Sequence, residues 1–184
     1  MKSIKAMTNA ELAAFIESHL LKRGIDVVLS GGACVSIYSS HKYVSMDLDL
    51  VNVRFVKRRD IRSAMKEIGF QEEGRHFRHP DTELFIEFPP GPLAVGKEPV
   101  KQVDERKLPT GVLRIISPTD CVKDRLAGYY HWNDLQSLEQ ASWVAEAIKI
   151  DLKEIERWSK VEGKLGEFKR IRTRLVRKEK TGSK

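Results

Sequence analysis

Two aspartates, Asp47 and Asp49, stand two residues apart in the apolar run MDLDLV. Because side chains alternate along a strand, this spacing places both carboxylates on one face. Carboxylates held side by side repel each other, and an oxygen-only site of this kind suits Mg²⁺. Metals held in this way can stabilise the attacking and leaving oxygens of a phosphoryl or nucleotidyl transfer. A strand whose polar face simply meets water would show the same alternation.

A pair of glycines, Gly31 and Gly32, precedes the acidic pair, between an apolar run and a short helical run. Glycines there let the backbone approach a ligand closely, and the start of the helix offers free amide groups to a phosphate. Ser30 and Ser45 could add hydroxyl contacts to that phosphate, or could satisfy nearby backbone groups. A tight turn without a ligand is the alternative interpretation.

A third carboxylate, Glu87, stands in the later apolar run LFIEF. A charge among apolar residues needs a partner or a metal, so Glu87 could complete a three-carboxylate site. The alternatives are an edge-strand glutamate that faces solvent, and Glu83 in its place. His76 and His79 have the spacing of metal ligands, but we expect a surface hairpin there with no acidic partner in register.

The elements that must position these residues follow from the apolar periodicity. Thr8-Asn9-Ala10-Glu11 has the form of a capping box and predicts a helix that ends at Gly24. A further helix is expected over 59–68 and a long loop from Pro89 to Gly111. Ser117-Pro118-Thr119-Asp120 begins a C-terminal part that reads as all helix. Strands are expected over 25–29, 45–53, 84–88 and 112–116.

This order predicts an α/β (α+β) protein with a small mixed sheet flanked by helices, followed by a helical C-terminal part. We place the core at 1–116 and the helical region with its basic tail at 117–184. No apolar run is long enough to cross a membrane, and the first residues do not resemble a signal peptide. Two cysteines provide no disulfide framework, so a cytoplasmic location is expected.

The net charge of +7 is concentrated at the C-terminal end of the chain. Residues 164–184 hold nine Lys or Arg and two Glu, so the remainder of the chain is neutral. A basic segment on a neutral body favours a polyanionic partner, RNA before DNA or a membrane. The alternative is a solvated tail that aids solubility.

The segment LSGGACVSIYSSHKYVSMDLDLV resembles the signature of the DNA polymerase β-like nucleotidyltransferase superfamily, in which Gly-Gly precedes an Asp-x-Asp between apolar residues. The resemblance implies a nucleotidyltransferase fold, a pair of Mg²⁺ ions and an NTP substrate. It assigns the metal ligands to Asp47 and Asp49, with Glu87 as the third carboxylate. It assigns the phosphate-binding turn to Gly31 and Gly32.

A second segment, SPTDCVKDRLAGYYHWNDLQSLEQA, resembles the helix that follows the core in abortive-infection E (AbiE) type toxins and related bacterial nucleotidyltransferases. Lys123 and Asp134 match residues of that pattern, whereas Asn133 stands where a basic residue is usual. The resemblance implies that Lys123 binds the triphosphate of the NTP. Without it, Lys123 would be interpreted as a surface lysine.

Together these features favour a Mg²⁺-dependent enzyme that transfers a nucleoside monophosphate from an NTP to RNA, tRNA or protein, as a toxin with a cognate antitoxin. One alternative is a catalytically inactive module of the same fold that binds nucleic acid or a partner protein. Another is an antibiotic-modifying nucleotidyltransferase, which an acidic pocket for a cationic drug would support.

Overall fold

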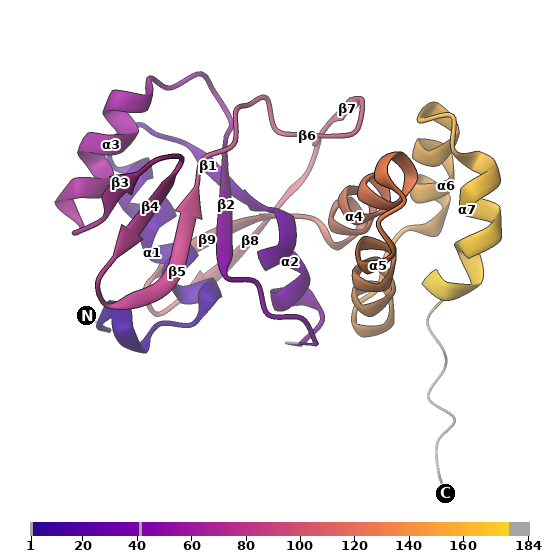
Figure 1. The fold of residues 1–184 in the computed structure, drawn as a ribbon, viewed down its shortest axis with the longest axis horizontal. Helices are drawn as coiled ribbons and strands as arrows, with labels where there is room; N and C mark the ends of the chain where they lie inside the picture. The colour runs from indigo at the N-terminus through magenta and orange to yellow at the C-terminus, as the bar shows by residue number, and fades with distance from the viewer. Residues whose placement is uncertain (1, 41, 177–184) are drawn as a thin grey trace, which may run out of the picture.

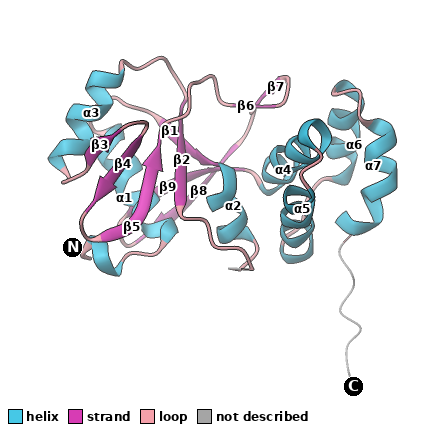
Figure 2. Ribbon diagram, viewed as in Figure 1, coloured by secondary structure: helices cyan, strands magenta, loops and turns pink. Residues whose placement is uncertain are grey.

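A computed structural model describes residues 2–40 and 42–176 of the chain. Within these residues, three α-helices alternate with two strands, further strands then follow one another up to Ile116, and helices follow from Pro118 (Figures 1 and 2). The basic tail beyond Val176 lies outside the described residues. The elements are η1 (Ile4–Ala6), α1 (Asn9–Leu21), β1 (Val27–Ser30), α2 (Gly31–Tyr38), β2 (Asp47–Asn52), α3 (Arg58–Glu67), β3 (Gln71–Glu73), β4 (His76–His79), β5 (Thr82–Glu87), β6 (Ala94–Val95), β7 (Glu98–Pro99), β8 (Val103–Leu108), β9 (Gly111–Ile116), α4 (Pro118–Trp132), α5 (Leu135–Ala147), α6 (Leu152–Val161), α7 (Leu165–Ile171) and η2 (Arg172–Leu175).

The centre of the core is a seven-stranded mixed sheet with the order β3-β4-β5-β2-β1-β9-β8. β2 runs antiparallel to β1 and parallel to β5, so it lies inside the sheet and not at an edge. Leu48 and Leu50 of β2 are fully buried, as expected for the core face of an inner strand. The predicted mixed sheet with flanking helices is confirmed.

The helices are placed by their caps and by the faces they bury. The predicted capping box is present, because the Thr8 hydroxyl accepts from the Glu11 N–H and the Glu11 carboxylate accepts from the Thr8 N–H at 2.9 Å. α1 packs along β9 and β1, and α3 packs against α1. α2 packs on β2 and also contacts α4 and α5, which links the sheet to the helical part (Figure 1).

The segment from Pro89 to Gly111, predicted as a loop, instead contains the β6–β7 hairpin and β8. β8 has the sequence VDERKL and lies at the edge of the sheet, where charged residues are common. These charged residues interrupt the apolar alternation from which a strand is predicted. The hairpin reaches α6, where Trp158 Nε1 donates to the Val95 carbonyl at 3.2 Å. Arg157 donates to Glu98 at 2.8 Å, so this hairpin fastens the core to the helical part.

The helical part begins as the sequence predicts. The Ser117 hydroxyl accepts from the Asp120 N–H at 3.1 Å, and Pro118 occupies the first turn of α4. Within the described residues, no helix is long and apolar enough to cross a membrane.

A buried glutamate, Glu17, joins α1 to the sheet. Its Oε2 accepts from the Arg114 N–H of β9 at 2.5 Å, while its Oε1 is buried without a partner among the described residues. Burial raises the pKa of Glu17 to about 9, although the Arg114 hydrogen bond opposes this shift. The side chain is therefore expected to be protonated at neutral pH.

Glu17→Gln tests this assignment. Between about pH 5 and pH 9 the folded state keeps a proton on Glu17 that the unfolded chain has already lost, so the wild type should lose stability as pH rises through that window. The loss is limited to about 1.4 kcal/mol per pH unit. Glutamine mimics the protonated acid, so the variant should show a flatter profile and greater stability at the alkaline end. Urea unfolding across the window measures this, and parallel profiles for the two proteins would exclude a neutral Glu17.

Candidate active site

The strand register brings the predicted acidic residues together. Asp49 of β2 lies opposite Ser30 of β1 on one side and opposite Glu87 of β5 on the other. Asp47 lies one pleat earlier on β2, opposite Phe85. Both aspartates are half-buried, which is consistent with a polar face of an inner strand that is only partly open to solvent.

The carboxylates are close enough to affect one another's ionisation. Burial, together with the negative charges of Asp47, Glu87 and Asp124, raises the pKa of Asp49 to about 7, against the opposing charge of Arg125. Within the described residues, no hydrogen bond or ion pair to the Asp49 carboxylate is present. A cation bound between Asp47 and Asp49 would relieve this repulsion.

The glycine turn lies directly against this carboxylate. Gly31 directly follows β1 and begins α2 with φ +70°, a conformation that favours glycine. A Cβ added at Gly31 would collide with the carboxylate of Asp49. Gly32 faces the Ser45 hydroxyl, which would lie 3.0 Å from an added Cβ. The glycines therefore permit close approach of the turn to the acidic strand.

The two predicted serines have different surroundings. Ser45 is buried, its hydroxyl donates to Asp47 Oδ1, and its N–H donates to the Ser36 hydroxyl at 2.9 Å. Ser45 therefore orients a carboxylate of the site. Ser30 precedes α2, and its side chain makes no capping hydrogen bond with the described start of that helix.

Glu87 is held by basic residues of the neighbouring hairpin. His76 of β4 lies opposite Glu87 in register, with 2.5 Å between His76 Nε2 and Glu87 Oε1. Arg75 Nε lies 3.4 Å from the same oxygen. The expectation that His76 has no acidic partner is therefore wrong, because the register across a hairpin depends on its turn and not on the spacing of the histidines. β5 lies between β4 and β2, so Glu87 is not on an edge strand.

The donor set fits a divalent metal in part. Asp47 and Asp49 supply the oxygen ligands that Mg²⁺ prefers. Glu87 could join them after releasing His76 and Arg75. Among the residues that the structure describes, no three His, Cys, Asp or Glu side chains are already grouped as a metal site.

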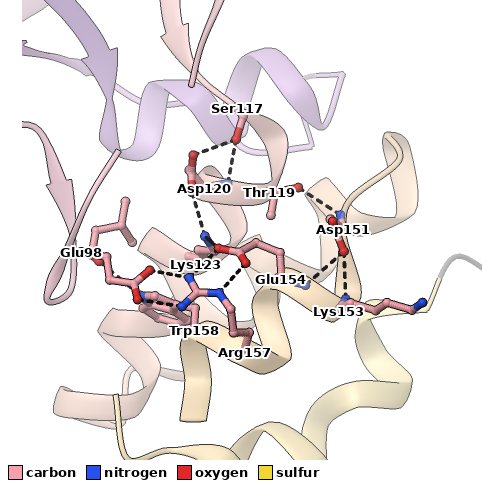
Figure 3. A network of polar contacts seen from close by, with 11 residues as sticks. Glu98, Ser117, Thr119, Asp120, Lys123, Asp151, Lys153, Glu154, Arg157 and Trp158 are labelled. Carbon is pink, nitrogen blue, oxygen red and sulfur yellow. Dashed lines mark hydrogen bonds and ion pairs between the residues drawn. The ribbon is translucent and has the colours of Figure 1, made fainter. Parts of the chain in front are cut away.

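Lys123 lies in a different place, in a cavity between the β6–β7 hairpin and the helices. It is buried, and its Nζ donates to Asp120 at 3.1 Å and to Glu154 at 2.7 Å (Figure 3). The cavity has a volume of about 360 Å³, and none of the predicted metal ligands lines it. Its acidic lining residues are Glu98, Asp104, Asp120, Asp151 and Glu154.

Two charged residues near the site were not identified from the sequence. Asp124 and Arg125 follow Lys123 on α4, and both affect the pKa of Asp49. Arg125 Nε donates to Asp124 Oδ2 at 3.0 Å. Burial alone would lower the pKa of Arg125, but the adjacent Asp124 more than offsets it, so the pKa is raised. Their sequence signal, two adjacent opposite charges on a helix, is common on solvated surfaces.

Comparison with known proteins places the fold in a structural class. No family model and no curated protein matches the sequence. An antigenic nucleotidyltransferase-like protein from Paracoccidioides brasiliensis superimposes with a TM-score of 0.53 at 15% identity, covering 92% of this chain and 94% of that one. The fold is that of a nucleotidyltransferase.

Two further solved structures also match. The solution structure of the antibiotic-resistance factor ANT(2'')-Ia is 13% identical, with a TM-score of 0.49, and covers 88% of this chain and 91% of that one. ANT(2'')-Ia in complex with adenylyl-2''-tobramycin is 14% identical, with a TM-score of 0.47, and covers 84% and 93%.

Gly31→Ala and Gly24→Ala separate backbone strain from the collision with Asp49. Both glycines have positive φ, but an added Cβ at Gly24 meets nothing within 4 Å. We expect Gly24→Ala to lower the free energy of unfolding by about 1 kcal/mol. Gly31→Ala should lower it by about 2 kcal/mol more, because the methyl group overpacks the site. Urea unfolding measures both, and equal losses would show that Asp49 moves aside without cost.

Proposed function

We propose that this protein is a Mg²⁺-dependent nucleotidyltransferase that transfers a nucleoside monophosphate from an NTP to an acceptor. The observation that carries the proposal is the alignment of Asp47 and Asp49 on an inner strand, with Glu87 opposite Asp49 and the Gly31 backbone against it. The nucleotidyltransferase fold supports the same reaction class.

In this proposal Asp47, Asp49 and Glu87 hold the metal. When bound, Mg²⁺ would supply positive charge for the triphosphate and the leaving pyrophosphate. Ser45 fixes the orientation of Asp47 through its hydroxyl. Glu87 also offers a carboxylate oxygen to accept the proton of the attacking hydroxyl.

The turn and one lysine would position the NTP. Gly31 and Gly32 present the first amides of α2, and Ser30 adds a hydroxyl beside them. Lys123 is proposed as a contact to the triphosphate. It would first have to leave its ion pairs with Asp120 and Glu154.

For the acceptor we propose RNA or tRNA, or alternatively a protein, in the role of a toxin controlled by a cognate antitoxin. The resemblance to AbiE type toxins and the net charge of +7 support this choice. A cytoplasmic location would suit that role.

A catalytically inactive module of the same fold is the second candidate. It is favoured by the hydrogen bond of Glu87 with His76 and its ion pair with Arg75, which occupy the third carboxylate. A small cationic acceptor is a further candidate, favoured by the five carboxylates that line the Lys123 cavity.

Metal binding has a readout that is independent of activity. At about a hundred times its dissociation constant, Mg²⁺ should stabilise the folded wild type by about 2.7 kcal/mol. For a chain of this size, that corresponds to a rise in Tm of about 5–10 °C. Asp47→Asn and Asp49→Asn should abolish the rise, and Asp81→Asn at an exposed position is the matched control. If Mg²⁺ leaves the Tm of the wild type unchanged, the proposed metal site is wrong.

Label transfer tests the reaction. The protein would be incubated with Mg²⁺ and each α-labelled NTP, with total RNA, protein extract or small cationic compounds as acceptors. Label should enter RNA or protein with the wild type, and transfer should fall by more than a hundredfold in Asp47→Ala. Label in a cationic compound alone would favour the small-molecule acceptor. Absence of transfer with every NTP, from folded protein that binds Mg²⁺, would favour the inactive module.

A further inference from the structure

A basic surface with an exposed aromatic ring covers the loop after β2 and the outer side of α3. Residues 54–66 contain six Lys or Arg and one acidic residue, Asp60. α3 lies at the opposite end of the molecule from α4–α7 (Figure 1). The residues of this α3 surface are Arg54, Phe55, Lys57, Arg59, Arg62 and Lys66, all of which are exposed.

Most of this positive charge is available to a partner. Arg62 is paired with Glu72, which also binds the half-buried Arg58 at 2.7 Å. Arg59 lies 3.3 Å from its neighbour Asp60. Within the described part of the chain, Arg54, Lys57 and Lys66 form no ion pair. The surface therefore keeps a positive excess that only an external anion can neutralise.

Phe55 projects from the middle of these charges and is 92% exposed. It borders a cavity of about 580 Å³ that Phe88 and Pro92 also line, with Arg54 and Arg58 at its margin. That volume falls in the range of pockets that hold small planar ligands. An exposed ring, guanidinium groups and an apolar cavity side by side provide a stacking platform inside a positive field.

We propose that the α3 surface binds single-stranded RNA, with one base stacked on Phe55 beside the cavity and the backbone phosphates on Arg54, Lys57 and Arg59. Stacking on one ring needs an unpaired base, which favours a single strand over a duplex. A membrane would use the positive charge but would leave the cavity unfilled.

The surface is connected to the acidic site through β2. Asp49 and Asn52 are three residues apart on that strand, and Asn52 lines the cavity next to Phe55. Three strand residues span about 10 Å. Because side chains alternate along a strand, Asn52 and Asp49 point to opposite faces of the sheet, so RNA held on the α3 surface would reach the acidic site by passing the end of β2. The proposal rests on the proposed function in taking RNA as the acceptor.

Binding can be measured without NTP or Mg²⁺, so its outcome is separate from that of label transfer. The probe is a fluorescent single-stranded RNA of about ten nucleotides, followed by anisotropy at several salt concentrations. Phe55→Ala should weaken binding about tenfold and leave the salt dependence unchanged. Arg54→Ala combined with Arg59→Ala should reduce the slope of log K against log salt by about 1.4.

Matched controls use exposed residues on the helical part. Trp132, which is 77% exposed, provides Trp132→Ala as the control for loss of an aromatic ring. Lys149→Ala combined with Lys160→Ala removes the same charge from exposed positions elsewhere. Both controls should bind like the wild type, and thermal unfolding confirms that every variant is folded.

Three results would overturn the proposal. They are wild-type affinity in both α3 variants, equal binding of a duplex of the same sequence, and preferential binding of anionic vesicles or an acidic polypeptide over the RNA. If RNA binding depends on Phe55 but label transfer to RNA fails, the surface is established and the proposed reaction is not.

Discussion

The contact between the Gly31 backbone and the Asp49 carboxylate is the constraint on which the site depends. The chain turns from β1 into α2 at a positive φ, and this turn lies directly against Asp49 of β2. A residue with a Cβ would not fit there without displacing the carboxylate. The same turn directs α2 toward α4 and α5, so it also determines where the helical part meets the sheet. A local steric requirement at one residue therefore links the acidic strand, the first amides of α2 and the second half of the molecule.

Electrostatic repulsion is the second feature of the site. The sheet holds Asp47, Asp49 and Glu87 close together in a partly buried place, where the folded chain does not neutralise all three. Ser45 orients Asp47, and His76 and Arg75 bind Glu87. Burial, with the negative charges of Asp47 and Glu87, raises the pKa of Asp49. Ionisable side chains whose charges the folded chain leaves unpaired are common in functional sites, because a bound ligand can neutralise them.

The two halves of the molecule contribute different surfaces. The β6–β7 hairpin crosses to α6 and encloses the cavity around Lys123, whose charge is balanced by Asp120 and Glu154. The α3 surface, at the other end of the sheet, retains a positive excess and an exposed ring. The lining of the Lys123 cavity contains more acidic than basic residues, whereas the α3 surface is basic.

Sequence alone determined the features that depend on neighbours along the chain. The alternation around Asp47 and Asp49, the capping box at Thr8 and the Gly-Gly turn each follow from local steric and hydrogen-bonding rules, and they contributed to the predicted mixed sheet. The nucleotidyltransferase fold was predicted from the resemblance of the Gly-Gly and Asp-x-Asp segment to that superfamily. The tertiary structure alone decided the rest, because pairing across strands depends on register. It brought His76 to Glu87, formed β8 from a charged edge segment, and placed Asp124 near Asp49 while enclosing the adjacent Lys123 elsewhere.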